Sequence, residues 1–156
     1  MLLPATIEIA VSQDAIRCAS RLVASSALAA IHEILQNCRR AGAQNIMINL
    51  VEEDGRAFLD IHDDGCGIDD PAALLTLGLS GWGDDIMRRE DPTGIGLFSL
   101  AGHGIEIHAF SPAMGEGWKV RIPAEAWNGD RALEPERCDL GWGTMVRIEI
   151  SGNWKM

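Results

Sequence analysis

One stretch decides how this chain folds: residues 57–67, which read AFLDIHDDGCG. Apolar and polar residues alternate through its first part, as they do in a half-buried strand. Because the side chains of a strand alternate between its two faces, Ala57, Leu59 and Ile61 share one face with Asp63. A carboxylate therefore points toward the core at the end of the strand, which is costly unless another group pairs with it.

Two glycines, Gly65 and Gly67, follow this acid at once. Glycine lets the backbone turn tightly and lets another molecule approach it closely. A buried acid next to an open backbone indicates a ligand that donates a hydrogen bond. This segment alone leaves an alternative open, in which Asp63 caps its own backbone in a strand-ending turn.

The composition is that of one domain: 156 residues, 47% of them apolar, with a formal net charge of −10. We expect a single domain over residues 1–150 and a tail at 151–156. The negative charge argues against direct binding to nucleic acid or to an anionic membrane, since both need a basic surface. No apolar run approaches the ~18 residues of a membrane span. The four scattered cysteines show no C-x-x-C pair and are typical of reduced thiols, so we expect a cytoplasmic location.

Hydrophobic periodicity predicts a two-layer α+β fold. The predicted strands each carry one apolar and one polar face, and they lie at 6–11, 46–51, 57–63, 105–110, 118–122 and 144–150. Helices are expected at 12–23, 25–41, 71–77 and 97–102. This pattern favours a two-layer sandwich with helices on one face of a mixed, mostly antiparallel sheet. Residues 78–92, rich in glycine, serine and charge, are predicted to form a mobile loop over a site.

The helix expected at 25–41 carries two kinds of residue. Glu33 and Asn37, four positions apart, lie side by side and away from the apolar stripe. An amide oxygen is a ligand for Mg²⁺, and a carboxylate one turn away can orient or deprotonate a water. The alternative is that both are plain solvated helix residues. The apolar stripe itself consists of Ala27, Leu28, Ile31, Ile34, Leu35 and Cys38.

Two further segments bear on the same site. Thr144, at the start of the last predicted strand, falls on the inner face and so points into the same layer as Asp63. A second glycine segment stands just before a predicted helix, where free backbone N–H groups bind phosphate. It consists of Thr93, Gly94, Ile95, Gly96 and Leu97.

In this order and at these distances, the segments resemble the ATP site of the GHKL superfamily. Its members include gyrase-type topoisomerases, the large heat-shock chaperone, MutL mismatch-repair proteins and sensor histidine kinases. Residues 33–37 match the E-x-x-x-N box and residues 63–67 the D-x-G-x-G box, both closest to MutL-like members. Residues 93–97 match the second glycine box, closer to its kinase version, and Gly143-Thr144 matches the late Gly-Thr. The resemblance covers roughly residues 25–150 and implies the Bergerat ATP-binding fold.

The resemblance also implies roles for the matching residues. Asp63 would accept a hydrogen bond from the adenine amino group, with Thr144 and a water completing that contact. Asn37 would ligate the Mg²⁺ that bridges the phosphates, and Glu33 would polarise the attacking water. Residues 78–92 would be the ATP lid. The other expected contacts are Gly65 and Gly67 for the purine and Thr93, Gly94, Ile95, Gly96 and Leu97 for the phosphates.

Three departures from the family pattern shape the expected activity. Asp64 stands where Asn is common, which adds negative charge near a nucleotide site. The segment 78–92 lacks the lysine of MutL-like lids. We also expect no second domain within this chain that would bring a lysine to the γ-phosphate. We therefore expect slow, Mg²⁺-dependent ATP hydrolysis that is coupled to closure of the lid. Closure is expected to drive a conformational switch or an ATP-dependent homodimer. A protein partner or an additional domain is also expected.

Two other classes of function stay open. A protein kinase module, of the histidine-kinase or anti-sigma serine-kinase type, is favoured by residues 93–97, and Glu33 does not exclude it. A non-catalytic interaction domain would keep the fold and the nucleotide without turnover. Phosphate transfer to a protein would select the first of these, and ADP binding without turnover would select the second.

Overall fold

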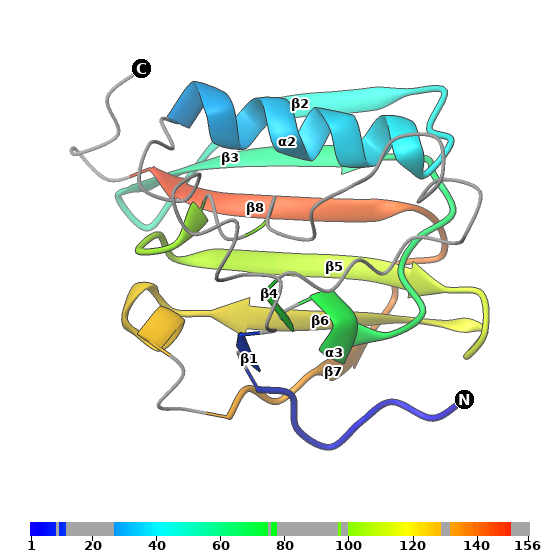
Figure 1. Ribbon diagram of the computed structural model, residues 1–156. Coiled ribbons are helices and arrows are strands. Elements are labelled where there is room, and N and C mark those ends of the chain that lie inside the picture. The colour runs from blue at the N-terminus through cyan, green and yellow to red at the C-terminus, as the bar shows by residue number, and fades with distance from the viewer. Residues whose placement is uncertain are drawn as a thin grey trace.

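A six-stranded antiparallel sheet forms the body of the chain in the computed structural model, which describes residues 1–8, 10–11, 27–74, 76–77, 97, 100–128 and 132–150. The strands lie in the order β2-β3-β8-β5-β6-β7, and each neighbouring pair is antiparallel (Figure 1). Their bounds are Ile46–Glu53 for β2, Arg56–Asp63 for β3, Ile105–Ser111 for β5, Glu116–Ile122 for β6, Glu136–Cys138 for β7 and Thr144–Ile150 for β8.

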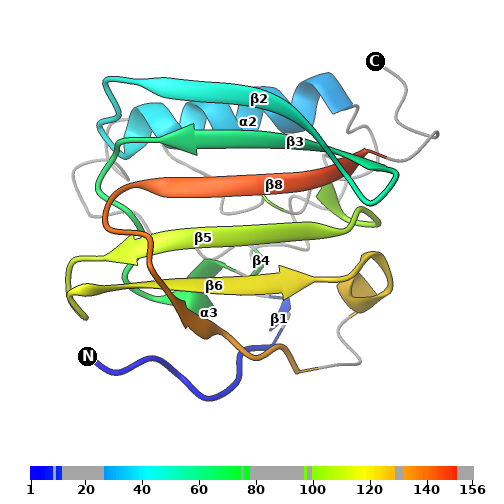
Figure 2. The same cartoon turned by 180° about the vertical axis from the view of Figure 1, so that it is seen from behind.

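Two helices, α2 (Ala27–Arg40) and α3 (Pro71–Leu74), lie on one face of this sheet, as the front and back views show (Figures 1 and 2). A short 3-10 helix (η2, Ala124–Asn128) follows β6. A separate parallel pair joins β1 (Ala10–Val11) to β4 (Thr76–Leu77). The predicted α+β sandwich is confirmed, with the described parallel pairing confined to β1 and β4. None of the described helices has the length and apolar character that a membrane crossing needs.

The inner face of the sheet follows directly from side-chain alternation. Along β5 every second residue from Ile105 is buried, and along β8 the buried residues are Thr144, Val146 and Ile148. The apolar side chains among them pack with Ile61 of β3 in one core. The strand periodicity read from the sequence therefore identified the buried face correctly.

α2 covers the core with a narrower stripe than the sequence predicted. Ala30, Ile34 and Cys38 are buried, while Ile31 and Leu35 are partly buried against the core. Leu28, which the predicted stripe included, is 69% exposed. At 100° per residue it lies well to one side of the buried line, so it reaches the flank of the helix and not the sheet. Gly42, with a φ of 74°, follows the helix and lets the chain turn back into β2.

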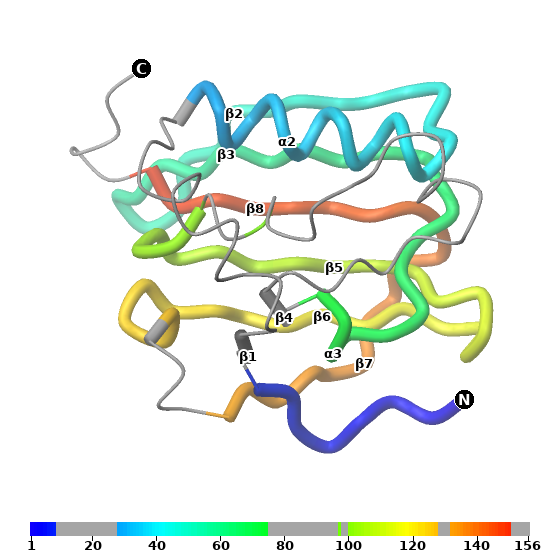
Figure 3. The backbone as a smooth tube through the Cα atoms, in the orientation of Figure 1, coloured from blue at the N-terminus to red at the C-terminus, as the bar shows by residue number. Residues whose placement is uncertain are grey.

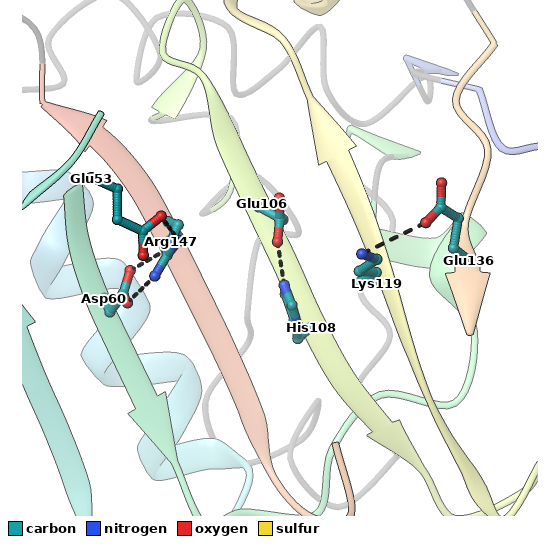
Figure 4. A network of polar contacts seen from close by, with 7 residues as sticks. All are labelled: Glu53, Asp60, Glu106, His108, Lys119, Glu136 and Arg147. Carbon is teal, nitrogen blue, oxygen red and sulfur yellow. Dashed lines mark hydrogen bonds and ion pairs between the residues drawn. The ribbon is translucent and has the colours of Figure 1, made fainter. Parts of the chain in front are cut away.

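The outer face of the sheet carries charged side chains that pair between neighbouring strands and, in one case, along a single strand (Figure 4). Arg147 of β8 donates two hydrogen bonds of 2.8 Å to Asp60 of β3 and one of 3.0 Å to Glu53 of β2. Farther along the sheet, Glu106 pairs with His108 and Lys119 lies 3.7 Å from Glu136. This network confirms the predicted solvated face opposite the helices.

Some predicted elements end elsewhere or lie outside the described residues. The short helix begins at Pro71 as expected but ends at Leu74, and residues 76–77 form β4 instead of its last turn. β7 was not predicted, because three residues are too few to show an alternation. The helix expected at 12–23 lies outside the part of the chain that the structure describes. Of the helix expected at 97–102, residues 98–99 lie outside it, while residues 97 and 100 are in 3-10 conformation and residues 101–102 form a turn.

Candidate functional site

Asp63 ends β3 with a carboxylate that is only 5% exposed. The backbone N–H of Gly65 donates a hydrogen bond to its Oδ1 at 2.8 Å, and the thiol of Cys38 on α2 donates to the same carboxylate. The inward acid predicted from the sequence is confirmed, and so is the local turn hydrogen bond of the alternative interpretation. A carboxylate has about four lone-pair sites, so both bonds together leave acceptor capacity on Asp63.

Cys38 is the residue of this cluster that the sequence reasoning placed only in the apolar stripe. Burial raises the pKa of its thiol, and the charge of Asp63 and their hydrogen bond raise it further, from the ordinary 9.0 to about 12. The thiol therefore keeps its proton at neutral pH and acts as a donor. Burial also raises the pKa of Cys66, whose side chain lies in the loop after β3. The contact between Cys38 and Asp63 fixes α2 against the end of β3.

Thr144 lies directly opposite Asp63 in the register of β3 and β8, and its side chain is 9% exposed. The residue before it, Gly143, has a φ of 67° and passes very close to β3. A β-carbon at Gly143 would stand 1.9 Å from the carbonyl oxygen of Asp63, far inside van der Waals contact. Only glycine therefore lets the loop deliver Thr144 to this position.

The two glycines after Asp63 are required by neighbouring protein atoms. A β-carbon at Gly65 would lie 2.6 Å from the β-carbon of Ala41, and one at Gly67 would lie 2.0 Å from the carbonyl oxygen of Phe110. The N–H of Cys66 also donates to the carbonyl of Ala41 at 3.0 Å. The loop is thus wedged between the end of α2 and the end of β5. The close approach of a purine to Gly65 and Gly67 stays a prediction.

Asp64 turns away from Asp63 and anchors the loop between α2 and β2. Its Oδ1 accepts the backbone N–H groups of Gln44 at 2.7 Å and Asn45 at 2.9 Å, and its Oδ2 accepts the side-chain amide of Asn45 at 2.8 Å. The backbone N–H and then the side chain of Asn45 hold the pKa of Asp64 below its ordinary value. The negatively charged carboxylate of Asp64 therefore accepts three hydrogen bonds from the protein itself.

Glu33 and Asn37 lie half-buried on one flank of α2. Asn37 directly precedes Cys38, whose thiol reaches Asp63, so the same turn of α2 carries both residues. The Oδ1 atom of Asn37 accepts a hydrogen bond of 3.1 Å from the guanidinium of Arg40. A cation thus already lies against the oxygen that was predicted to ligate Mg²⁺.

The side chains around Asn37 could hold Mg²⁺ only if phosphate oxygens of a nucleotide supplied most of the other ligands. Among the described residues no three His, Cys, Asp or Glu side chains gather to hold a metal ion. Mg²⁺ in nucleotide sites commonly keeps several waters and takes one or two protein ligands beside the phosphates. Asn37, with its oxygen released by Arg40, would be one such ligand.

His62 and Trp142 form a stack that the sequence did not reveal. Their ring centroids are 4.4 Å apart and their planes differ by 16°. His62 directly precedes Asp63, and Trp142 directly precedes Gly143, so the stack holds together the two segments that carry the buried pair. Trp142 is 49% exposed, while Nε2 of His62 is buried without a hydrogen-bond partner in the described part of the chain.

The remaining predicted contacts fall largely outside the described residues. The lid at 78–92 and the residues Thr93, Gly94, Ile95 and Gly96 are not part of the structure described here. Leu97 is described, and its side chain is partly buried against the core. The arrangement around Asp63 is thus the described part of the predicted site, and both the adenine contact and the phosphate end stay predictions.

Comparison with known proteins gives matches in structure only. No family model and no curated protein sequence matches the chain. The ATPase domain of Aquifex aeolicus MutL complexed with ADP superposes with a TM-score of 0.51 at 17% identity, over 80% of this chain and 42% of that one. The N-terminal domain of a DNA repair protein superposes with a TM-score of 0.55 at 19% identity, over 88% and 41%. The chain shares their fold and spans about two-fifths of their length.

Proposed function

We propose that this chain binds ATP and ADP through an adenine end built on Asp63 and Thr144. A single observation carries the proposal: a buried carboxylate with unused acceptor capacity lies opposite a buried hydroxyl at the end of a strand pair. The adenine amino group is a donor that such a carboxylate would accept. Support comes from the shared fold, because one of the structures with this fold is an ATPase domain complexed with ADP.

We assign the opposite end of the nucleotide to α2. Asn37 would turn its amide oxygen to the Mg²⁺ of the bound nucleotide, and Glu33, one turn away on the same flank, would orient and deprotonate the attacking water. Mg²⁺, when bound, would neutralise charge on the phosphate oxygens. The guanidinium of Arg40 would leave Asn37 in this step, since it now donates to the same oxygen.

The remaining contacts of the site, most of which lie outside the described residues, complete the proposal. Gly65 and Gly67 would contact the purine, and the segment from Thr93 to Leu97 would hold the phosphates. Residues 78–92 would close over them as a lid. Lid closure would be coupled to ATP-dependent homodimerisation, or to binding of a protein partner or a further domain. The nucleotide site would belong to a single domain over residues 1–150, and the protein would act in the cytoplasm.

Thermal unfolding with nucleotides tests the binding step. A ligand that binds only the native state should add about 2.7 kcal/mol at 100 times its Kd. We expect Mg·ATP, Mg·ADP and a non-hydrolysable analogue each to raise the Tm of the wild-type chain. Asp63→Asn should abolish the shift, while Asp54→Asn, an exposed aspartate at the opposite end of β3, should keep it. A shift that survives Asp63→Asn would refute the adenine assignment.

Phosphate release tests the hydrolysis step separately. Glu33→Gln should abolish release of phosphate from ATP while leaving the ADP shift intact, because the residue acts at the phosphate end. Equal rates in the wild type and this variant would refute the role of Glu33 as base.

Binding without turnover is the second candidate, and the hydrogen bond from Arg40 to Asn37 favours it. A guanidinium held on the metal-ligating oxygen would keep Mg²⁺ from its place. In that case the wild-type chain would bind ADP and release no phosphate, and Arg40→Ala would permit slow release. Transfer of labelled phosphate from ATP to another protein would instead select the kinase alternative.

A further inference from the structure

Exposed apolar side chains gather along β2, far more than on any other described strand. Ile46, Ile48 and Leu50 are 39%, 52% and 68% exposed. They stand in register with the inward residues of β3, so they face the side of the sheet that carries α2. β2 is the outermost strand of the sheet (Figures 1, 2 and 3), and among the described strands β3 alone pairs with it. The other edge of its backbone has no strand partner in the described part of the chain.

α2 adds further apolar surface beside this edge. Helix periodicity puts Leu28 and Leu35 on the flank opposite to Glu33 and Asn37. In Figure 1, α2 lies in front of β2 and β3 and runs from left to right. In a right-handed helix with this direction, the flank that carries Leu28 and Leu35 is turned toward β2. The side chain of Leu28 is 69% exposed and that of Leu35 is partly buried. We call this surface the β2 flank, and it consists of Leu28, Leu35, Ile46, Ile48 and Leu50.

β2 lacks the features that normally protect a sheet edge. It reads IMINLVEE, with no proline, no lysine and no charge before its last two residues. An open edge with apolar side chains pairs readily with another strand. A strand from a partner would pair with the backbone groups of β2 and cover its apolar side chains.

The charges beside the β2 flank identify the partner. α2 and β2 run in opposite directions, because only residues 41–45 join them, so Arg39 at the end of α2 lies near the start of β2. Glu52 lies at the other end of β2, is exposed, and faces the α2 side because it pairs with Ala57. One end of the β2 flank is thus basic and the other acidic, on the same face of the sheet.

We propose that two copies of this chain pair through their β2 edges, antiparallel and about a two-fold axis. Because that axis reverses one flank against the other, Arg39 of each copy meets Glu52 of its partner. The five apolar residues of one copy then pack, in reversed order, against the same five residues of the other. The product is one continuous twelve-stranded sheet, twice the six strands of one copy. Because Glu33 and Asn37 lie on the opposite flank of α2, this dimer leaves the proposed nucleotide site open and forms without nucleotide.

Sedimentation without nucleotide tests the pairing in the full chain. At about 0.15 M salt, which screens the general repulsion between chains of charge −10, the wild type should sediment as a dimer. Ile48→Lys and Leu50→Lys should each weaken the dimer at least about tenfold. Leu2→Lys, at a residue that is 84% exposed elsewhere, should leave it unchanged. A wild type that stays monomeric up to about 1 mM overturns the proposal.

Charge reversal tests the two-fold arrangement itself, and thermal melts first establish that each variant is folded. Arg39→Glu and Glu52→Arg should each weaken the dimer at least about tenfold, because each puts like charges together. An equimolar mixture of these two variants should dimerise again, since both of its contacts then join opposite charges. Arg121→Glu, the same change on β6, should have no effect.

Three outcomes would overturn the arrangement. The mixture could fail to dimerise although the wild type does. Sedimentation could show open-ended polymers, which a closed two-fold pair excludes. The dimer could also require Mg·ATP, in which case the proposed nucleotide site would be retained and the β2 pairing rejected.

Discussion

Asp63 and Thr144 are register partners at the last position of the β3–β8 pair, and both side chains are buried on the face that carries α2. Residues directly opposite in an antiparallel pair have β-carbons about 4.5–5.5 Å apart. A carboxylate and a hydroxyl at that separation can bind one ligand group, or one water, together. Strand pairing thus joins residues from the two halves of the chain into one polar site.

Removing the hydroxyl of Thr144 should weaken nucleotide binding moderately. A neutral hydrogen bond contributes about 0.5–1.5 kcal/mol, so Thr144→Val should raise the Kd for ADP about 2- to 13-fold. Thr144→Ser keeps the hydroxyl and should bind within about threefold of the wild type. Calorimetric titration of both variants checks this. Equal affinities for the two would show that the hydroxyl does not contact the ligand.

Gly143→Ala should lower the free energy of unfolding by more than the strain of placing alanine at a positive φ would. The added β-carbon would lie 1.9 Å from the carbonyl oxygen of Asp63, so the β3–β8 pair would have to shift. Backbone strain and overpacking together should lower the free energy of unfolding by about 2–5 kcal/mol. Gly115→Ala is the matched control, because its φ is 71° and no atom lies within 4 Å of the added carbon. Urea unfolding measures both, and equal losses would contradict the clash.

Cys38 should make the protein sensitive to alkali. The pKa of its thiol in the folded chain is raised from the ordinary 9.0 to about 12. A raised folded pKa means that the thiol's contribution to stability is complete below about pH 9 and is lost as the pH rises toward about 12. The free energy of unfolding should therefore fall through that window.

The alkaline loss can be assigned to one thiol by substitution. Cys38→Ala should be less stable at neutral pH but should lose less stability between pH 9 and about 12 than the wild type does. Cys138→Ala, on the edge strand β7, should keep the wild-type slope. Urea unfolding at a series of pH values measures the slopes, and identical slopes for the wild type and Cys38→Ala would refute the assignment.

Local patterns predicted the layers of this fold and the direction of its key side chains. Whether Asp63 or Thr144 faces inward depends only on alternation along one strand, which is visible in the sequence. The inner faces of β3, β5 and β8 were therefore predicted correctly. The register that sets Asp63 against Thr144 depends on how separate strands pair, and no local pattern contains it.

Contacts that span elements were beyond local patterns for the same reason. The hydrogen bond from Cys38 to Asp63 depends on how deep α2 sits on the sheet, and the sequence showed only a small apolar residue in a helical stripe. Leu28 was assigned to that stripe because apolar residues of a helix are expected to cover the core. Its exposure follows both from its angle on the helix, to one side of the buried line, and from the position of α2 beside the outermost strand. The sequence contains only the first of these.

The stack of His62 on Trp142 should stabilise the two segments that end in Asp63 and Gly143. Aromatic pairs contribute about 0.5–1.5 kcal/mol beyond the area they bury, so Trp142→Ala should lower the free energy of unfolding and Trp142→Phe should recover most of the loss. His62→Ala and Trp142→Ala together should cost less than the sum of their separate losses, because both remove the same contact. Additive losses would show that the rings are not coupled.

His62→Phe separates the ring from its polar atom. Nε2 of His62 is buried without a hydrogen-bond partner in the described residues, and leaving such an atom unpaired costs about 1–3 kcal/mol. Phe keeps a flat ring against Trp142 and removes that atom, so His62→Phe should be as stable as the wild type or more so, whereas His62→Ala should be less stable. Urea unfolding of both variants measures this. A His62→Phe chain as unstable as His62→Ala would mean that Nε2 makes a bond that the fold needs.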